Sequence, residues 1–289
     1  MDVTLIQVPY DSGHREVRMG RGPGHLVSLG AAQAVEAATG GNVAMERVEA
    51  DTAFTTEIGT AFELAHKLTG EIARARRNGT FPLVLAGNCM SSVGTITGLT
   101  DVPRLGIVWL DAHGDLNTPE TSPTGFLDGM ALAVCTGRCW GTLAGSLPGF
   151  EAVPDERILH VGARALDPAE DTLFREGDFL SVSGDALRNG GAGVLEDPLE
   201  ALAARADAVY LHLDMDVHDA RTVRANPFAE PGGPSPQQVR RLIDAIAQRI
   251  PVAGAAVTAY APDYDRDGAA GQAALELLQT VASAVAVRH

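Results

Sequence analysis

The stretch GIVWLDAHGDLN, residues 106–117, decides how the rest of the chain is interpreted. Gly106 to Leu110 form a short apolar run rich in β-formers, which predicts a buried strand. Asp111, His113 and Asp115 follow at two-residue spacing. Such side chains point to one side of an extended chain, so two carboxylates and an imidazole converge. Because converging like charges repel, the stretch predicts a cation site at a strand end.

A second stretch repeats this arrangement further along the chain. Residues 208–219 read AVYLHLDMDVHD, an apolar run closed by Asp214, Asp216 and Asp219. A single Asp-x-Asp is more often a solvated loop than a ligand set. Two acidic strand ends in one chain instead favour one shared site.

Composition limits the class of protein. The 289 residues can form one large α/β domain or two smaller ones, and because no linker divides them we expect a single domain, residues 1–289. The formal net charge of -15 argues against nucleic acid and anionic membranes and suits metal ions or small cationic substrates. The apolar runs are too short to span a membrane and the N-terminus lacks a signal-peptide layout. We therefore expect a cytoplasmic protein, which could form a homo-oligomer.

Strand signals alternate with helical ones. The strand signals cover Val3 to Val8, Phe81 to Ala86, Gly106 to Leu110, Ile158 to Val161, Ala208 to Leu213 and Gly254 to Tyr260. Helical periodicity is clearest over Glu57 to Arg77, Ser235 to Ile250 and Gln272 to Val287. Ser235 and Gln238 have the spacing of a capping box. This alternation predicts a parallel sheet between helices, with ligands beyond the carboxyl ends of its strands.

Two glycine-containing segments and the cysteines complete the reading. Residues 19–24 lack the Lys-Ser/Thr of a phosphate loop and are interpreted as a structural loop. Residues 85–94 follow a strand and open a helix, which would bring Cys89 to the same plane of strand ends as Asp111. Cys135 and Cys139 could pair or bind metal, but two buried thiols on a helix is the favoured interpretation.

At this point the residues resemble a known family. Asp-Ala-His-x-Asp-x-Asn at 111–117 and Asp-x-Asp-x-x-Asp at 214–219 are similar to the two metal motifs of the arginase/agmatinase (ureohydrolase) family. Further similar segments are Val8-Pro9 with Gly20-x-Gly-Pro23, His160-Val-Gly-Ala-Arg164 and Glu230-Pro-Gly-Gly233. The resemblance therefore extends over most of the chain.

The resemblance implies a doubly wound, three-layer α/β/α fold and a binuclear centre with two Mn²⁺ per chain that activates a water for attack on a guanidine carbon. By position, Asp111 and Asp214 would bridge the metals and take part in catalysis. Asp115 would bind one metal, and His113 and Asp216 the other. Carboxylate and imidazole ligands suit Mn²⁺, and two ions can lower the pKa of a bridging water.

Three positions depart from the family's pattern. Cys89 stands where the family usually has a metal-binding His, and it remains a candidate ligand, although a thiolate suits Zn²⁺ or Fe²⁺ better. The alternative is that Cys89 sits near the metal unbound. Asp128 replaces a His proposed as a proton shuttle, and Ala259 replaces a Glu that faces the guanidinium.

At the end of the expected substrate site that holds the amino-acid head, the residues match the family's pattern. Asn117, Thr124 and Asp167 occupy positions that hold the α-carboxylate and α-amine in arginases proper. This favours an arginine-like α-amino acid over agmatine, which has no carboxylate. Thr124 and Asp167 could instead only cap turns. His218 follows the second acidic stretch and is interpreted as a solvated histidine.

The missing Glu points to a less basic substrate. An N-hydroxyguanidine binds largely neutral and needs that Glu less. The resemblance therefore points to the Nω-hydroxy-L-arginine hydrolases of specialised metabolism, the branch of the family that makes L-ornithine and hydroxyurea. The alternatives are an ordinary arginase, an agmatinase or guanidino-acid hydrolase, and a metal-binding pseudoenzyme.

Overall fold

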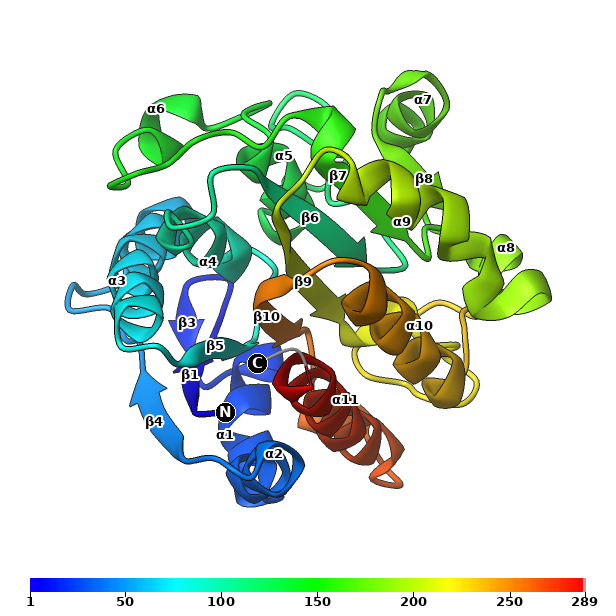
Figure 1. The fold of residues 1–289 in the computed structure, drawn as a ribbon. Helices are drawn as coiled ribbons and strands as arrows, with labels where there is room; N and C mark the ends of the chain where they lie inside the picture. The colour runs from blue at the N-terminus through cyan, green and yellow to red at the C-terminus, as the bar shows by residue number, and fades with distance from the viewer. Residues whose placement is uncertain (288–289) are drawn as a thin grey trace.

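The computed structural model describes residues 1–287 and is built around an eight-stranded sheet (Figure 1). Its strands are β1 Val3–Val8, β4 Val43–Arg47, β5 Phe81–Ala86, β6 Leu105–Leu110, β7 Ile158–Val161, β8 Leu180–Val182, β9 Ala208–Asp214 and β10 Val252–Thr258. They lie in the order β4-β1-β5-β10-β9-β6-β7-β8, and every neighbouring pair is parallel. A separate small hairpin pairs β2 Tyr10–Asp11 with β3 His14–Arg15.

Helices cover both faces of this sheet. They are α1 Gly22–Ser28, α2 Ala31–Thr39, α3 Glu57–Arg77, α4 Ser91–Gly98, α5 Ala131–Cys135, α6 Gly141–Ala144, α7 Pro168–Glu176, α8 Gly184–Gly190, α9 Glu196–Ala203, α10 Pro236–Arg249 and α11 Ala269–Ala286. One apolar core joins α3, α4 and α5 to the sheet, and a second joins α2, α10 and α11 to the opposite face (Figure 1). The expected three-layer, mainly parallel α/β/α fold is therefore confirmed.

Strand alternation decides which face each side chain of β6 enters. Ile107 and Trp109 belong to the core under α3 and α4, whereas Val108 and Leu110 belong to the core under α10 and α11. A strand buried on both faces reads as a continuous apolar run, which is why this segment could be recognised. The same alternation aims Asp111, two residues beyond Trp109, toward the α3 and α4 side.

The predicted elements agree closely with the observed ones. Helix α3 has the predicted bounds, and the Ser235 box is present: its Oγ accepts from the Gln238 N–H and its N–H donates to Gln238 Oε1. Strand β10 lies two residues earlier than expected, and α11 begins at Ala269. The edge strands β4 and β8 were missed because β4 is mostly exposed and β8 is only three residues long.

Two interpretations of local structure were wrong. Residues 19–24 are not a loop but the short helix η1 Arg18–Arg21 running into α1. Gly22 serves close packing there, since a Cβ would lie 2.2 Å from the Tyr260 carbonyl oxygen. The cysteines are free and buried as expected, but Cys139 lies beyond the end of α5 rather than on it. No helix within residues 1–287 is long and apolar enough to cross a membrane.

Candidate functional site

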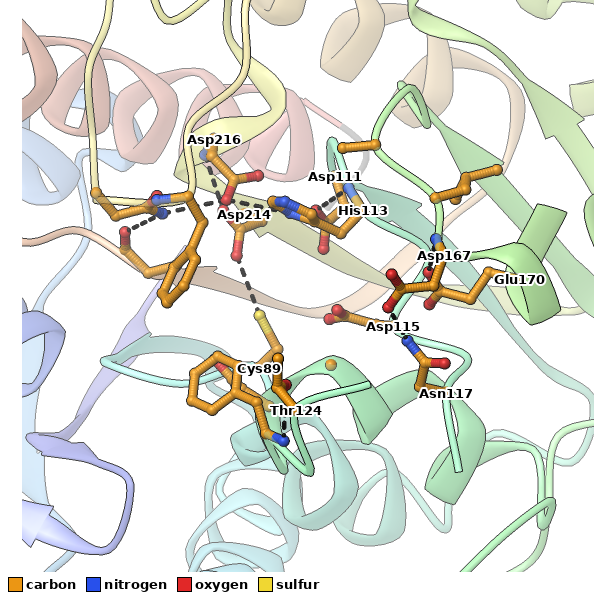
Figure 2. Close-up of a pocket in the computed structure, with 18 of the residues that line it drawn as sticks. Cys89, Asp111, His113, Asp115, Asn117, Thr124, Asp167, Glu170, Asp214 and Asp216 are labelled. Atoms are coloured by element: carbon orange, nitrogen blue, oxygen red, sulfur yellow. Dashed lines mark hydrogen bonds and ion pairs between the residues drawn. The ribbon is translucent and has the colours of Figure 1, made fainter. Parts of the chain in front are cut away.

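The two acidic stretches meet at the carboxyl ends of β6 and β9, which are neighbours with Leu110 opposite Leu213. A cavity of about 450 Å³ opens there (Figure 2). Every site residue predicted from the sequence lines it, namely Cys89, Asp111, His113, Asp115, Asn117, Thr124, Asp128, Asp167, Asp214 and Asp216. The structure thus brings together residues that are far apart in the chain.

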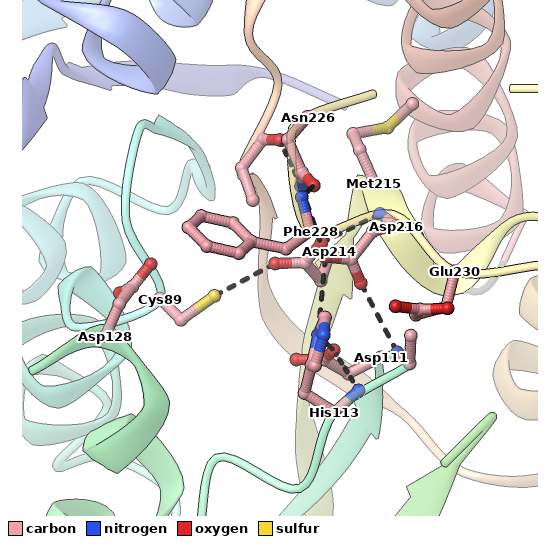
Figure 3. A network of polar contacts seen from close by, with 12 residues as sticks. Cys89, Asp111, His113, Asp128, Asp214, Met215, Asp216, Asn226, Phe228 and Glu230 are labelled. Carbon is pink, nitrogen blue, oxygen red and sulfur yellow. Dashed lines mark hydrogen bonds and ion pairs between the residues drawn. The ribbon is translucent and has the colours of Figure 1, made fainter. Parts of the chain in front are cut away.

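Hydrogen bonds fix the carboxylate that ends β6. Asp111 Oδ2 accepts from the Trp109 indole N–H at 3.0 Å, and Oδ1 accepts from the His113 backbone N–H at 2.8 Å. The His113 Nδ1 lies 3.4 Å from both Asp111 Oδ1 and Asp216 Oδ2 (Figure 3). Burial opposes protonation of His113, but the carboxylates of Asp216 and Asp111 outweigh it and raise its pKa.

The carboxylates of Asp214, the last residue of β9, and of Asp216 are held in the same way. Asp214 Oδ1 accepts from the Asp216 backbone N–H at 2.8 Å, and Oδ2 accepts from the Cys89 thiol at 3.1 Å. Asp216 Oδ2 accepts from Asn226 Nδ2 at 3.2 Å, and its Oδ1 accepts from the Ala112 N–H at 3.4 Å. The end of β9 and the short 3-10 helix η5 Met215–Val217 therefore present both carboxylates at one edge of the sheet.

The side chains form two groups with the spacing of metal ligands. Cys89, Asp111, His212 and Asp214 make one group, and Asp111, His113 and Asp216 make the other. Burial, followed by the neighbouring carboxylates, raises the pKa of Asp111 and of Asp214. These groups are charged at low cost only beside a cation, so the chemistry of the donor set fits a pair of metal ions that share Asp111.

The buried carboxylate of Asp115 is a further indication of a cation-binding position. It belongs to neither group, yet its side chain points into the same cavity (Figure 2). Its Oδ2 is buried without a hydrogen-bond partner, and burial together with the charge of Asp111 raises its pKa well above the usual range. Its φ of 51° is left-handed, a conformation that is uncommon outside glycine. Strain and an unpaired buried oxygen together are typical of a ligand-binding position.

Cys89 lies in the loop between β5 and α4, and Asp128 begins the short 3-10 helix η2 Asp128–Met130, which faces that loop. The expectation that this loop brings Cys89 to the end of the sheet is confirmed by its contact with Asp214. Burial and the neighbouring carboxylates raise the pKa of the Cys89 thiol. Asp128 accepts from Asn88 Nδ2 at 2.8 Å and from the Met90 N–H at 3.1 Å, and burial raises its pKa to about 7. Figure 3 shows Cys89 between Asp128 and Asp214.

The outer part of the cavity is built from loops. Asn117 Nδ2 donates to Asp167 Oδ2 at 2.8 Å. Asp167 is the N-cap residue of α7, and its backbone N–H donates to Glu170. Thr124 is exposed, and its hydroxyl accepts from the Phe126 N–H at 3.2 Å. Asp167 and Thr124 thus take part in local turns and also line the cavity.

Sequence reasoning missed several residues that hold the site in place. The Arg164 guanidinium donates to the carbonyl oxygens of Gly162, Asp216, His218, Glu230 and Pro231. Asn226 joins two strand ends, because its Nδ2 also donates to the Ala259 carbonyl oxygen at 2.9 Å. Glu170 accepts from the Leu116 N–H at 3.0 Å. None of these contacts follows from periodicity, because loops make them.

The sequence analysis misjudged one histidine and overlooked another. His218 was interpreted as solvated, but it is fully buried and its Nδ1 lies 2.9 Å from the Met215 carbonyl oxygen. His212 was not considered, although its spacing of two residues from Asp214 was a usable signal. The alternation rule that identified Asp214 and Asp216 would have included it.

Comparison with known proteins gives a consistent result. The Arginase family model matches residues 1–283. An arginase of Bacillus subtilis is 32% identical over 218 residues, 74% of this chain and 73% of that protein. An arginase of Bacillus caldovelox is 36% identical over 157 residues, and this alignment spans about half of each protein, 53% and 52%. The crystal structure of arginase from Bacillus cereus superposes with a TM-score of 0.88 at 26% identity, covering 97% of this chain and 98% of the other.

Proposed function

This chain belongs to the arginase family of hydrolases, and from that premise we propose that it is a binuclear-metal amidinohydrolase acting on an arginine-like α-amino acid. The proposed preferred substrate is Nω-hydroxy-L-arginine, and the products are L-ornithine and hydroxyurea. The observation that carries this choice is Ala259, which lines the cavity where the resemblance expects a Glu.

Charge explains why this position selects the substrate. A guanidinium is cationic at any biological pH, and a buried cation needs an anionic partner. An N-hydroxyguanidine is less basic and binds largely neutral, so it tolerates an alanine there. Its hydroxyl also adds a donor and an acceptor, which Asp128 or the polar surroundings of Cys89 can satisfy. A site that pairs such a hydroxyl discriminates strongly against the analogue that lacks it.

The proposed cofactor is a pair of divalent cations, with Mn²⁺ as the choice that the resemblance implies for both positions. Asp111 and Asp214 are proposed to bridge them, in keeping with the place of Asp111 in both ligand groups. His113 and Asp216 would complete one position, and Asp115 and Cys89 would complete the other. When bound, the two cations would lower the pKa of a water molecule enough for attack near neutral pH.

The chain's own residues position the substrate and move protons. Asn117, Thr124 and Asp167 are proposed to hold the α-carboxylate and α-amine at the outer end of the cavity. Water adds to the central guanidine carbon, the bond from that carbon to the ornithine nitrogen breaks, and a proton passes to the departing amine. We assign that proton to Asp128 or to water, because Asn88 and Met90 hold this buried carboxyl at the cavity wall.

Competition between Nω-hydroxy-L-arginine and L-arginine for one enzyme preparation tests the substrate. We expect kcat/KM for the hydroxylated compound to be higher by roughly tenfold or more. A kcat/KM for L-arginine that equals or exceeds it would make the protein an ordinary arginase. Agmatine is the control for the amino-acid head, and efficient turnover of agmatine would contradict that part of the proposal. Metal-loaded protein that turns over none of the three would support the pseudoenzyme alternative.

A further inference from the structure

The imidazole of His212 lies close to Cys89, Asp111 and Asp214, three of the proposed metal ligands. On β9 it precedes Asp214 by two residues, so both side chains enter the same face of the sheet. The ring is fully buried and stacks on the Trp109 indole, with ring centroids 3.6 Å apart. The proposed reaction gives this buried nitrogen base no role.

The two nitrogens of this ring have different surroundings. Nδ1 lies 2.9 Å from Ser92 Oγ and 3.2 Å from the Tyr210 hydroxyl. Nε2 lies 3.3 Å from Thr258 Oγ1, and that hydroxyl is 3.4 Å from Asp214 Oδ2 and 3.5 Å from Cys89 Sγ. Nε2 is therefore directed toward the place where Cys89 Sγ and Asp214 Oδ2 lie close together. Its contact with the threonine is also the longest of the three and the easiest to exchange.

Four different donors converge at this point. The sulfur of Cys89, a ring nitrogen of His212 and one oxygen each of Asp111 and Asp214 all lie within 4.8 Å of one another. If Nδ1 carries the ring proton and donates it to Ser92, the lone pair of Nε2 is available for a cation. Histidines that bind metals commonly donate their other N–H to a fixed partner in this manner.

We propose that His212 supplies the nitrogen ligand of an inner metal position that is completed by Cys89, Asp111 and Asp214. The inference rests on the proposed two-metal centre and changes the ligand set of one of its positions, where His212 stands in place of Asp115. Thiolate and imidazole donors suit Zn²⁺, whereas the second metal position, formed by Asp111, His113 and Asp216, is rich in oxygen ligands and suits Mn²⁺. The two positions are therefore chemically unlike, and the inner one takes Zn²⁺ in place of Mn²⁺.

Nuclear magnetic resonance of the unaltered chain tests the ligand directly. The protein is labelled with ¹⁵N in its histidine rings, loaded with ¹¹³Cd²⁺ as the probe metal, and examined for one-bond ¹¹³Cd–¹⁵N coupling. We expect coupling at both His113 and His212, with the resonances assigned by their loss in single His→Asn variants. Coupling at His113 without coupling at His212 would overturn this inference and leave the proposed two-metal centre standing. Coupling at neither would overturn both.

Two variants separate a ligand from a supporting residue. His212→Asn removes Nε2, whereas Ser92→Ala removes only a hydroxyl that orients the ring. We expect the Kd for the inner Zn²⁺ to rise by more than about 100-fold in His212→Asn and by about tenfold in Ser92→Ala. Equal rises would mean that His212 acts only as a hydrogen-bonding support. The number of coupled histidines, two or one, is counted on the unaltered chain, so a variant that fails to fold does not remove the test.

Metal selection provides an independent measurement. Unaltered protein offered a large excess of Mn²⁺ over Zn²⁺ should retain one ion of each per chain in elemental analysis, because Zn²⁺ binds more tightly than Mn²⁺ at any one site and the excess lets Mn²⁺ keep the oxygen-rich position. Cys89→Ser, which replaces the sulfur by an oxygen, should shift the inner position toward Mn²⁺. Two Mn²⁺ ions in the unaltered chain would contradict the inference.

Discussion

The two ends of the cavity are held by different kinds of structure. At the inner end, Asp111 and Asp214 come from the ends of neighbouring central strands, and buried donors fix their oxygens. At the outer end, Thr124 comes from the loop between β6 and α5, Asp167 comes from the loop between β7 and α7, and Thr124 is exposed. The difference teaches that, in the proposed enzyme, the sheet would position the reacting groups and the loops would bind the rest of the substrate. Changes at the inner end should therefore abolish the reaction, and changes at the outer end should only weaken binding.

The largest effect is expected at the carboxylate that both ligand groups share. Asp111→Asn should lose metal and activity together, with kcat falling on the order of 10³-fold, since several kcal/mol of transition-state stabilisation depend on the metals. Elemental analysis and kinetics on one preparation measure both losses. Asp244→Asn, an exposed change on α10, is the control. Full metal content with normal kcat in the Asp111 variant would show that the inner end is not where the chemistry takes place.

A smaller effect is expected at the charged residue of the outer end. Asp167→Asn should raise KM for the amino-acid substrate by about 10- to 100-fold, the equivalent of roughly 1.5 to 3 kcal/mol for a charged hydrogen bond. Metal content and kcat should stay near those of the unaltered protein. Asp171→Asn on the same helix is a matched control, because its carboxylate is exposed and pairs with Arg175. Loss of metal in Asp167→Asn would erase the distinction between the two ends.

The smallest effect is expected where the outer end offers a neutral group. Thr124→Val keeps the shape of the side chain but removes the hydroxyl, so KM should rise only a few-fold, as for a hydrogen bond of about 0.5 to 1.5 kcal/mol. Steady-state kinetics beside Thr172→Val, an exposed change on α7, measures it. A loss in kcat as large as that of Asp111→Asn would mean that Thr124 acts at the reacting end.

Local rules account for what the sequence alone could reveal. Two-residue spacing after an apolar run identified Asp111 and Asp214, and the pairing of β6 with β9 shows why both lie at one edge. The same rule, extended back by two residues, would have found His212. It could not have found Arg164 or Asn226 as supports of the site. Their partners are carbonyls and carboxylates on other loops, and such contacts exist only once the whole chain has folded.

The way Arg164 holds its neighbours has a consequence for how this cavity can diversify. Besides the Gly162 carbonyl oxygen, its guanidinium donates to the backbone oxygens of Asp216, His218, Glu230 and Pro231. Every residue type offers the same carbonyl, so side chains on that segment that neither bind the proposed metals nor hold Asp216 can be exchanged without breaking these hydrogen bonds. Phe228, which borders the cavity from this segment, is one such replaceable position. Substitutions at such positions, in evolution or by design, can therefore change which substrate side chains the cavity accepts while Asp216 stays in place.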